Sequence, residues 1–145
     1  MENKYNMTQE QNIFLAKRNL VDNIYSNARL EGLNITFPQT KTILEGINVP
    51  ELKIDEIQCI LNLRDAWKYV INNIDLDFNL EFISKVNEFV ARNESIEWGK
   101  LRNGKVEITG TSYIPEVPKE ENVKNDIAKI LEIENTTERA IEYML

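Results

Sequence analysis

Residues 54–74 have the sequence Ile-Asp-Glu-Ile-Gln-Cys-Ile-Leu-Asn-Leu-Arg-Asp-Ala-Trp-Lys-Tyr-Val-Ile-Asn-Asn-Ile, which carries a strong helical pattern. The apolar side chains in this stretch recur every three or four residues, a spacing that places them along one stripe of an α-helix. They are Ile54, Ile57, Ile60, Leu61, Trp67, Val70, Ile71 and Ile74. We therefore predict an amphipathic helix over 54–74.

The same spacing on both sides of this stretch predicts further helices. Thr8 and Gln11 have the capping-box pattern that begins a helix, and Pro38 suits the first turn of another. The expected helices cover about 8–31, 38–45, 80–92 and 121–132, and a last one begins at 136 or 137.

Residues 105–114 differ, because Val, Ile, Thr and Tyr alternate there with other residues. This pattern predicts a short β-hairpin with Gly110 at or near its turn. The expected fold is therefore mostly α, a helical bundle with one short β-hairpin. It forms a single domain over 8–145, preceded by a flexible tail over 1–7.

The composition is that of an ordinary globular domain, with 42% hydrophobic and 28% charged residues in a chain of 145. The net charge of −7 argues against nucleic acid as a partner, because phosphate contacts need a basic face, and against an anionic membrane surface. The single cysteine, Cys59, excludes an internal disulfide and fits a reducing compartment. No apolar leader and no long apolar run are found, so we expect a cytoplasmic protein.

The chain lacks the residues of the common catalytic centres. With no histidine and one cysteine, it cannot contain a Ser-His-Asp or Cys-His arrangement, or a usual zinc site. Cys59 lies in an apolar run and is expected to be a small core residue, as are Trp67 and Trp98. Residues 99–105 have the Gly-x4-Gly-Lys spacing of a phosphate-binding loop, but Val106 replaces the Ser or Thr that binds magnesium. We predict no catalytic residue and no metal ligand within the chain.

Glu31 is unusual for its place in the helix expected over 8–31. It follows Ala28 by three residues and Ile24 by seven, which puts it on the apolar stripe and in the last turn. The helix dipole disfavours a negative charge there by roughly 0.3–1 kcal/mol. Two interpretations stay open. Either the carboxylate lies on the buried face and needs a cation or hydrogen-bond donors, or the helix frays and Glu31 is solvated.

Five short motifs follow one another along the chain. They are Leu30-Glu31-Gly32-Leu33-Asn34, Asn62-Leu63-Arg64-Asp65-Ala66, Trp98-Gly99-Lys100-Leu101-Arg102, Val106-Glu107-Ile108-Thr109-Gly110-Thr111 and Thr137-Glu138-Arg139-Ala140-Ile141-Glu142. In this order, and with Pro115 and Pro118 between the last two, they resemble the amino-terminal part of the Fic (Fido) family. The resemblance covers about residues 8–145 and implies a Fic-like helical bundle.

The first motif resembles the inhibitory segment of that family, whose pattern is Ser/Thr-x-x-x-Glu-Gly/Asn. The resemblance implies a regulatory role for Glu31, Gly32 and Asn27. Asn27 stands where the family has Ser or Thr, and Ser26 is one residue out of register. In a complete family member, the glutamate would pair with an arginine of the catalytic loop and exclude the γ-phosphate orientation that in-line attack needs.

The fourth motif resembles the hairpin called the flap, which would hold a target segment as an added β-strand. The resemblance thus implies that a protein target or a partner chain binds at Val106, Glu107, Ile108, Thr109, Gly110 and Thr111.

Fic proteins transfer a nucleotidyl group, typically AMP from ATP, to a target hydroxyl. The family's catalytic motif, His-x-Phe-x-Asp/Glu-Gly-Asn-Gly/Lys-Arg, is absent from this sequence. We therefore expect the regulatory and target-binding part of such a protein, inactive alone and without its own cofactor. A complete member would use ATP and magnesium. The alternative is a non-enzymatic helical interaction module, antitoxin-like or a scaffold, and self-association stays open.

Overall fold

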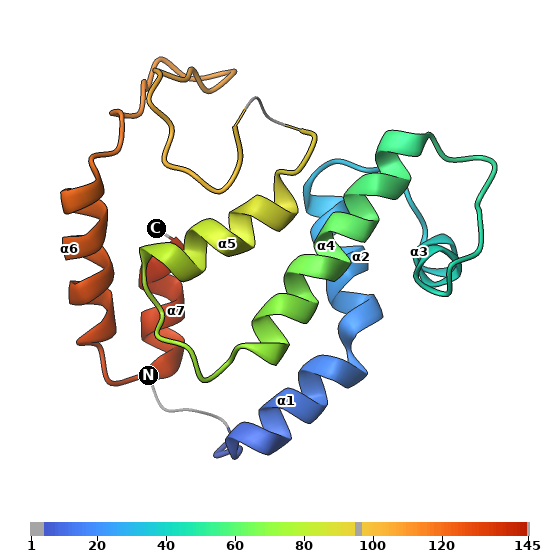
Figure 1. Cartoon of the computed structure of the whole chain (residues 1–145), viewed down its shortest axis with the longest axis horizontal. Coiled ribbons are helices and arrows are strands. Elements are labelled where there is room, and N and C mark those ends of the chain that lie inside the picture. The colour runs from blue at the N-terminus through green and yellow to red at the C-terminus, as the bar shows by residue number, and fades with distance from the viewer. Residues whose placement is uncertain (1–4, 95–96, 145) are drawn as a thin grey trace.

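The structure is a computed structural model that describes residues 5–94 and 97–144 (Figure 1). Residues 1–4, part of the expected tail, and Leu145 lie outside the described residues. The described part is helical and contains no β-strand, which confirms the mostly α prediction. Its helices are α1 (Gln9–Arg18), α2 (Leu20–Leu30), α3 (Phe37–Leu44), α4 (Ile54–Asn72), α5 (Leu80–Val90), α6 (Glu120–Leu131) and α7 (Thr136–Met144).

The core forms around the amino-terminal two thirds of α4, which packs against α2, α3 and α5 (Figure 1). Ile24 of α2 and Ile60 of α4 have no exposed surface. Burying one such side chain contributes about 1.5–3 kcal/mol, so this seam holds the helices together. The remaining buried members of the cluster are Ala28, Ile35, Ile43, Val49, Cys59 and Leu63.

Side-chain caps set several helix ends where the sequence predicted them. At α1, the hydroxyl of Thr8 accepts a hydrogen bond from the Gln11 backbone (3.2 Å), and the Gln11 side chain accepts one from the Thr8 backbone (2.9 Å). Thr36 and Gln39 form the same box at α3. Each cap satisfies backbone N–H groups that have no partner within the first turn.

The single helix expected over 8–31 is in fact two helices. Asn19 ends α1, donating its backbone N–H to the Leu15 carbonyl (2.9 Å), and α2 begins at the next residue. Asparagine is a weak helix former, because its short amide competes for nearby backbone groups. The break matters because α1 buries no residue fully, whereas α2 turns inward and buries Ile24 and Ala28.

The hairpin expected over 105–114 does not form in the described structure. A turn is present, in which Thr111 donates its N–H to the Ile108 carbonyl (3.2 Å) and Gly110 has φ +89°. Hairpin turns of two residues also need a positive φ, or a glycine, at the first central position. Thr109 is there and is not among the residues with positive φ, so the turn does not match the twist of paired strands.

The carboxyl-terminal helices lie on the other side of α5 from α2 and α3 (Figure 1). α6 contacts both α5 and α7, and only Ile127 of α6 is buried. None of the helices in 5–94 and 97–144 combines the length and apolar character needed to span a bilayer.

The buried seam gives a direct test of the fold. We expect Ile60→Ala to lower the free energy of unfolding by about 2–5 kcal/mol, because it removes buried apolar surface and leaves a cavity. Ile54, in the same helix, is 83% exposed, and Ile54→Ala should change stability by no more than about 0.5 kcal/mol. Urea melts of the two variants measure this difference. Equal losses would contradict the packing of α4 described above.

Candidate functional site

Glu31 is the first residue after α2, and its side chain is exposed, so of the two interpretations the buried one is wrong and the solvated one holds. The reason is the way the helix ends. Gly32 has φ +84° and donates its N–H to the Arg29 carbonyl (3.1 Å), while Leu33 donates to the Ala28 carbonyl (3.0 Å). These are the two bonds of a Schellman motif. The apolar stripe therefore continues through Leu33, and Glu31 points outward.

The carboxylate of Glu31 forms no ion pair with any residue of the described chain. The nearby cation, Arg29, instead donates to the Leu33 carbonyl (3.0 Å) and to the Asn34 side chain (3.3 Å). Glu31 also lies at the negative end of the α2 dipole. The site therefore presents an anion whose surroundings favour an incoming cation.

Cys59 of α4 is buried in the core cluster that also contains Ala28 of α2. Burial raises the pKa of the Cys59 thiol to about 12, and the carboxylates of Glu94 and Glu31 act in the same direction, Glu94 also by a hydrogen bond. The thiol is therefore neutral at physiological pH. Its burial confirms the prediction of a core residue.

Asn27 fixes α2 against α4 one turn before Glu31. The indole N–H of Trp67 donates a hydrogen bond to the Asn27 side-chain oxygen (3.0 Å), and both side chains are half-buried. The structure thus gives Asn27 a positioning role, whereas Ser26 is exposed. Trp67 packs at the edge of the core cluster rather than within it.

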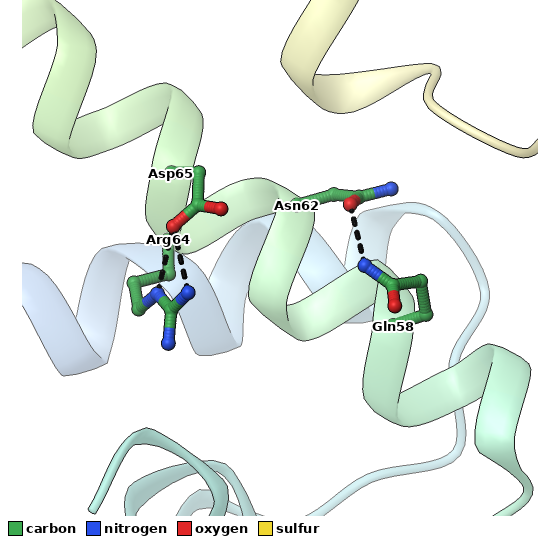
Figure 2. A network of polar contacts seen from close by, with 4 residues as sticks. All are labelled: Gln58, Asn62, Arg64 and Asp65. Carbon is green, nitrogen blue, oxygen red and sulfur yellow. Dashed lines mark hydrogen bonds and ion pairs between the residues drawn. The ribbon is translucent and has the colours of Figure 1, made fainter. Parts of the chain in front are cut away.

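The motif at 62–66 holds α4 to the end of α5. The buried Asn62 side chain accepts a hydrogen bond from Gln58 (2.9 Å), as Figure 2 shows. It also donates one to the Arg92 carbonyl (2.8 Å). Arg64 and Asp65 form a side-chain ion pair (2.8 Å) beside it. The bond to Arg92 satisfies a backbone carbonyl just beyond the end of α5, so this motif is structural.

The segment expected to be the flap is an exposed loop. Val106, Glu107, Ile108, Thr109, Gly110 and Thr111 are all exposed, and in Figure 1 this loop lies at the top, apart from the carboxyl end of α2. The described structure therefore places the two candidate sites at different points of the molecule.

Arg102 closes the base of this loop, a role that sequence reasoning missed. Its guanidinium donates to the Gly104 carbonyl (2.9 Å), to the Glu116 carbonyl (2.5 Å) and to the Pro115 carbonyl (3.4 Å). One planar fork thus joins both ends of the loop. The Gly-x-x-Arg spacing identified the residue but not its partners, because they come later in the chain.

Gly99 seats the start of the loop on α5. Its N–H donates to the Asn87 side chain (2.9 Å), and its φ is +67°. A Cβ at this position would lie 3.0 Å from the Cβ of Glu88 and 3.2 Å from the Ser84 carbonyl. Both the backbone conformation and the close approach require glycine here.

Among the described residues, no group of three or more cysteine, aspartate or glutamate side chains could hold a metal ion. Comparison of the chain with protein-family models, curated proteins and solved structures gave no match.

Because Glu31 is exposed and unpaired, we expect Glu31→Gln to change the free energy of unfolding by no more than about 0.5 kcal/mol. Removing a charge from the end of α2 can even stabilise the fold slightly. Asn62→Ala should instead cost about 1–3 kcal/mol, because it removes the hydrogen bond to the Arg92 carbonyl. Denaturant melts measure both changes. A loss above about 2 kcal/mol for Glu31→Gln would mean that this carboxylate holds the fold together.

A second prediction concerns Arg102. Arg102→Met should speed cleavage after Glu107 by a glutamate-specific protease about tenfold, since the loop loses its charged hydrogen bonds and opens more often. Lys105→Met, which removes a charge within the same loop, should leave the rate unchanged. Time courses at one protease concentration provide the measurement. Equal cleavage of the two variants would show that the guanidinium does not restrain the loop.

Proposed function

We propose that this chain is the amino-terminal, regulatory and target-binding part of a Fic-like protein nucleotidyltransferase, which moves AMP from ATP to a protein hydroxyl. The observation that carries the proposal is the Glu31 carboxylate, exposed at the end of α2 and without a cation among the described residues. An arginine that approached this end of the helix would gain two charge-assisted hydrogen bonds.

The surroundings of Glu31 suit an inhibitory role. The Asn27–Trp67 hydrogen bond and the Schellman turn at Gly32 fix the backbone from which the carboxylate projects. A fixed backbone reduces the conformational freedom that is lost when the side chain binds a guanidinium. In a complete protein, Glu31 would form an ion pair with the catalytic-loop arginine that otherwise orients the γ-phosphate of ATP. AMP transfer would then be blocked.

The loop at 106–111 would contribute the target-binding surface. Val106 and Ile108 are 42% and 48% exposed and lie two residues apart, as alternate side chains of a strand do. We propose that the loop becomes a strand when an extended target segment pairs with it, because an isolated two-stranded ribbon is only marginally stable in water. Arg102 would keep the ends of the loop together during this change.

ATP and Mg²⁺ belong to complete family members. The described residues include no acidic cluster that fits the metal ion, and we assign this chain no step that uses it. The isolated chain should not label proteins in a lysate with AMP from labelled ATP. Its affinity for ATP should be millimolar or weaker, which corresponds to about −4 kcal/mol or less favourable binding. Micromolar ATP binding by calorimetry would contradict this assignment.

A chimera tests the regulatory role directly. Residues 1–144 are joined to the catalytic part of a Fic protein that carries the His-x-Phe-x-Asp/Glu-Gly-Asn-Gly/Lys-Arg motif. We expect Glu31→Gln in the chimera to raise AMP transfer by about tenfold or more, within the usual range of coupling between two sites.

Glu45 provides the matched control for this experiment. It also follows a helix, α3, and precedes a glycine with positive φ, Gly46. Glu45→Gln should therefore leave AMP transfer unchanged. Equal effects of the two substitutions, or no increase with Glu31→Gln, would refute the inhibitory role. The coding sequence beyond the Leu145 codon offers an independent check, since the catalytic motif should follow within roughly one helix length.

The alternative, a non-enzymatic helical interaction module such as an antitoxin-like or scaffold protein, is favoured by a different observation. An apolar groove lies open between α4, α5 and α7. If the chimera shows no regulation and the groove binds a protein segment, the interaction module is the better description.

A further inference from the structure

The apolar groove has a volume of about 580 Å³ and lies on the carboxyl-terminal part of α4. Its walls come from α4, from the segment that joins α4 to α5, from α5 and from α7. The lining includes Val70, Ile74, Leu76, Phe82, Val86 and Tyr143. Ile74, Leu76 and Tyr143 keep 46%, 55% and 47% of their surface exposed. Side chains that would normally be buried are therefore left at the surface.

The groove does not end at α4. A second hollow of about 510 Å³ lies between α1 and α4 and shares Val70 and Ile74 with the first. The first hollow alone is about four times the roughly 150 Å³ cavity that a benzene molecule fills. It thus has room for about four large side chains, the number that two turns of an amphipathic helix present at i, i+3, i+4 and i+7.

Acidic side chains lie at the rim of the groove, because Asp77 and Glu81 line an adjoining hollow that shares Leu76 and Phe82 with it. Among residues next in sequence to a lining residue, five are acidic and only Lys85 is basic, and Lys85 is paired with Glu88 (2.8 Å). The exposed acids are Asp75, Asp77, Glu81 and Glu142. Three of these, all but Asp75, form no ion pair or hydrogen bond with another described residue through their side chains.

We infer that this groove binds an amphipathic, positively charged helix of a partner protein. Apolar side chains on one face of that helix would fill the groove, and lysines or arginines on its flanks would meet the acidic rim. A second copy of this chain fits less well, because two copies joined groove to groove would bring both acidic rims together. The inference does not depend on the proposed nucleotidyl transfer.

A designed peptide serves as the probe. It contains only leucine and lysine over about 18 residues, with leucine at i, i+3, i+4 and i+7, and carries a fluorophore for anisotropy. We expect a Kd on the order of 10 μM at low salt. Two matched peptides separate the two parts of the argument. Glutamate in place of lysine should weaken binding at least tenfold, and a scrambled order that keeps the charge but loses the apolar face should do the same.

Variants of the full chain locate the binding. Leu76→Asp should weaken binding of the leucine-lysine peptide at least tenfold, because it puts a charge into the groove, and Asp77→Asn with Glu81→Gln should weaken it and reduce its dependence on salt. Ile47→Asp is the control. Ile47 is 57% exposed but lies outside the groove, and this change should have no effect.

Several results would overturn the inference. Equal binding of the lysine and glutamate peptides would refute the acidic rim, and equal binding to the Leu76→Asp and Ile47→Asp variants would place the peptide elsewhere. Sedimentation of the chain alone gives the third test. A dimer that Leu76→Asp dissociates would show that a second copy, and not a partner helix, occupies the groove. Each of these measurements is independent of AMP transfer by the chimera, so the two proposals can fail separately.

Discussion

The packing of α4 between α2, α3 and α5 is the constraint on which the rest of the structure depends. Its amino-terminal part is covered on several sides, and Ile60 has no exposed surface. One polar side chain lies within this packing. Asn62 is buried with its hydrogen-bonding groups satisfied, and it fixes the end of α5. The carboxyl-terminal end of the same helix carries Val70, which lines the open groove together with Ile74, two residues beyond the helix.

Helical spacing and caps allowed most of the fold to be predicted. The capping box at Thr8, Pro38 in the first turn of α3 and the apolar stripe of α4 are local signals, and these helices begin close to where they indicate. The predicted hairpin does not form, and the alternation of residue types in the sequence could not show why. Pairing of strands depends on the backbone angles of the turn, and those at Thr109 and Gly110 do not suit it.

The candidate site was predictable as a set of residues but not as a geometry. The apolar stripe does not predict the direction of the Glu31 side chain. Helix α2 ends at Leu30, so helical spacing no longer applies at Glu31. Glu31-Gly32 and Glu45-Gly46 look alike in sequence. Only the three-dimensional contacts distinguish them, since Glu45 pairs loosely with Lys41 (3.9 Å) and Glu31 forms no ion pair with a described residue. The groove was not predictable at all, because a stripe on a helix does not reveal what covers it.

Asn87 connects the apolar groove to the loop that Arg102 closes. It lines the apolar groove, and its side chain also accepts the N–H of Gly99 at the start of the loop that Arg102 closes. A molecule bound in the groove could form a hydrogen bond with the Asn87 side chain. The Gly99 N–H would then lose its acceptor, and the loop would be held less firmly to α5. Thermodynamic linkage then works in both directions: a ligand that ordered the loop would change the affinity of the groove by the same factor.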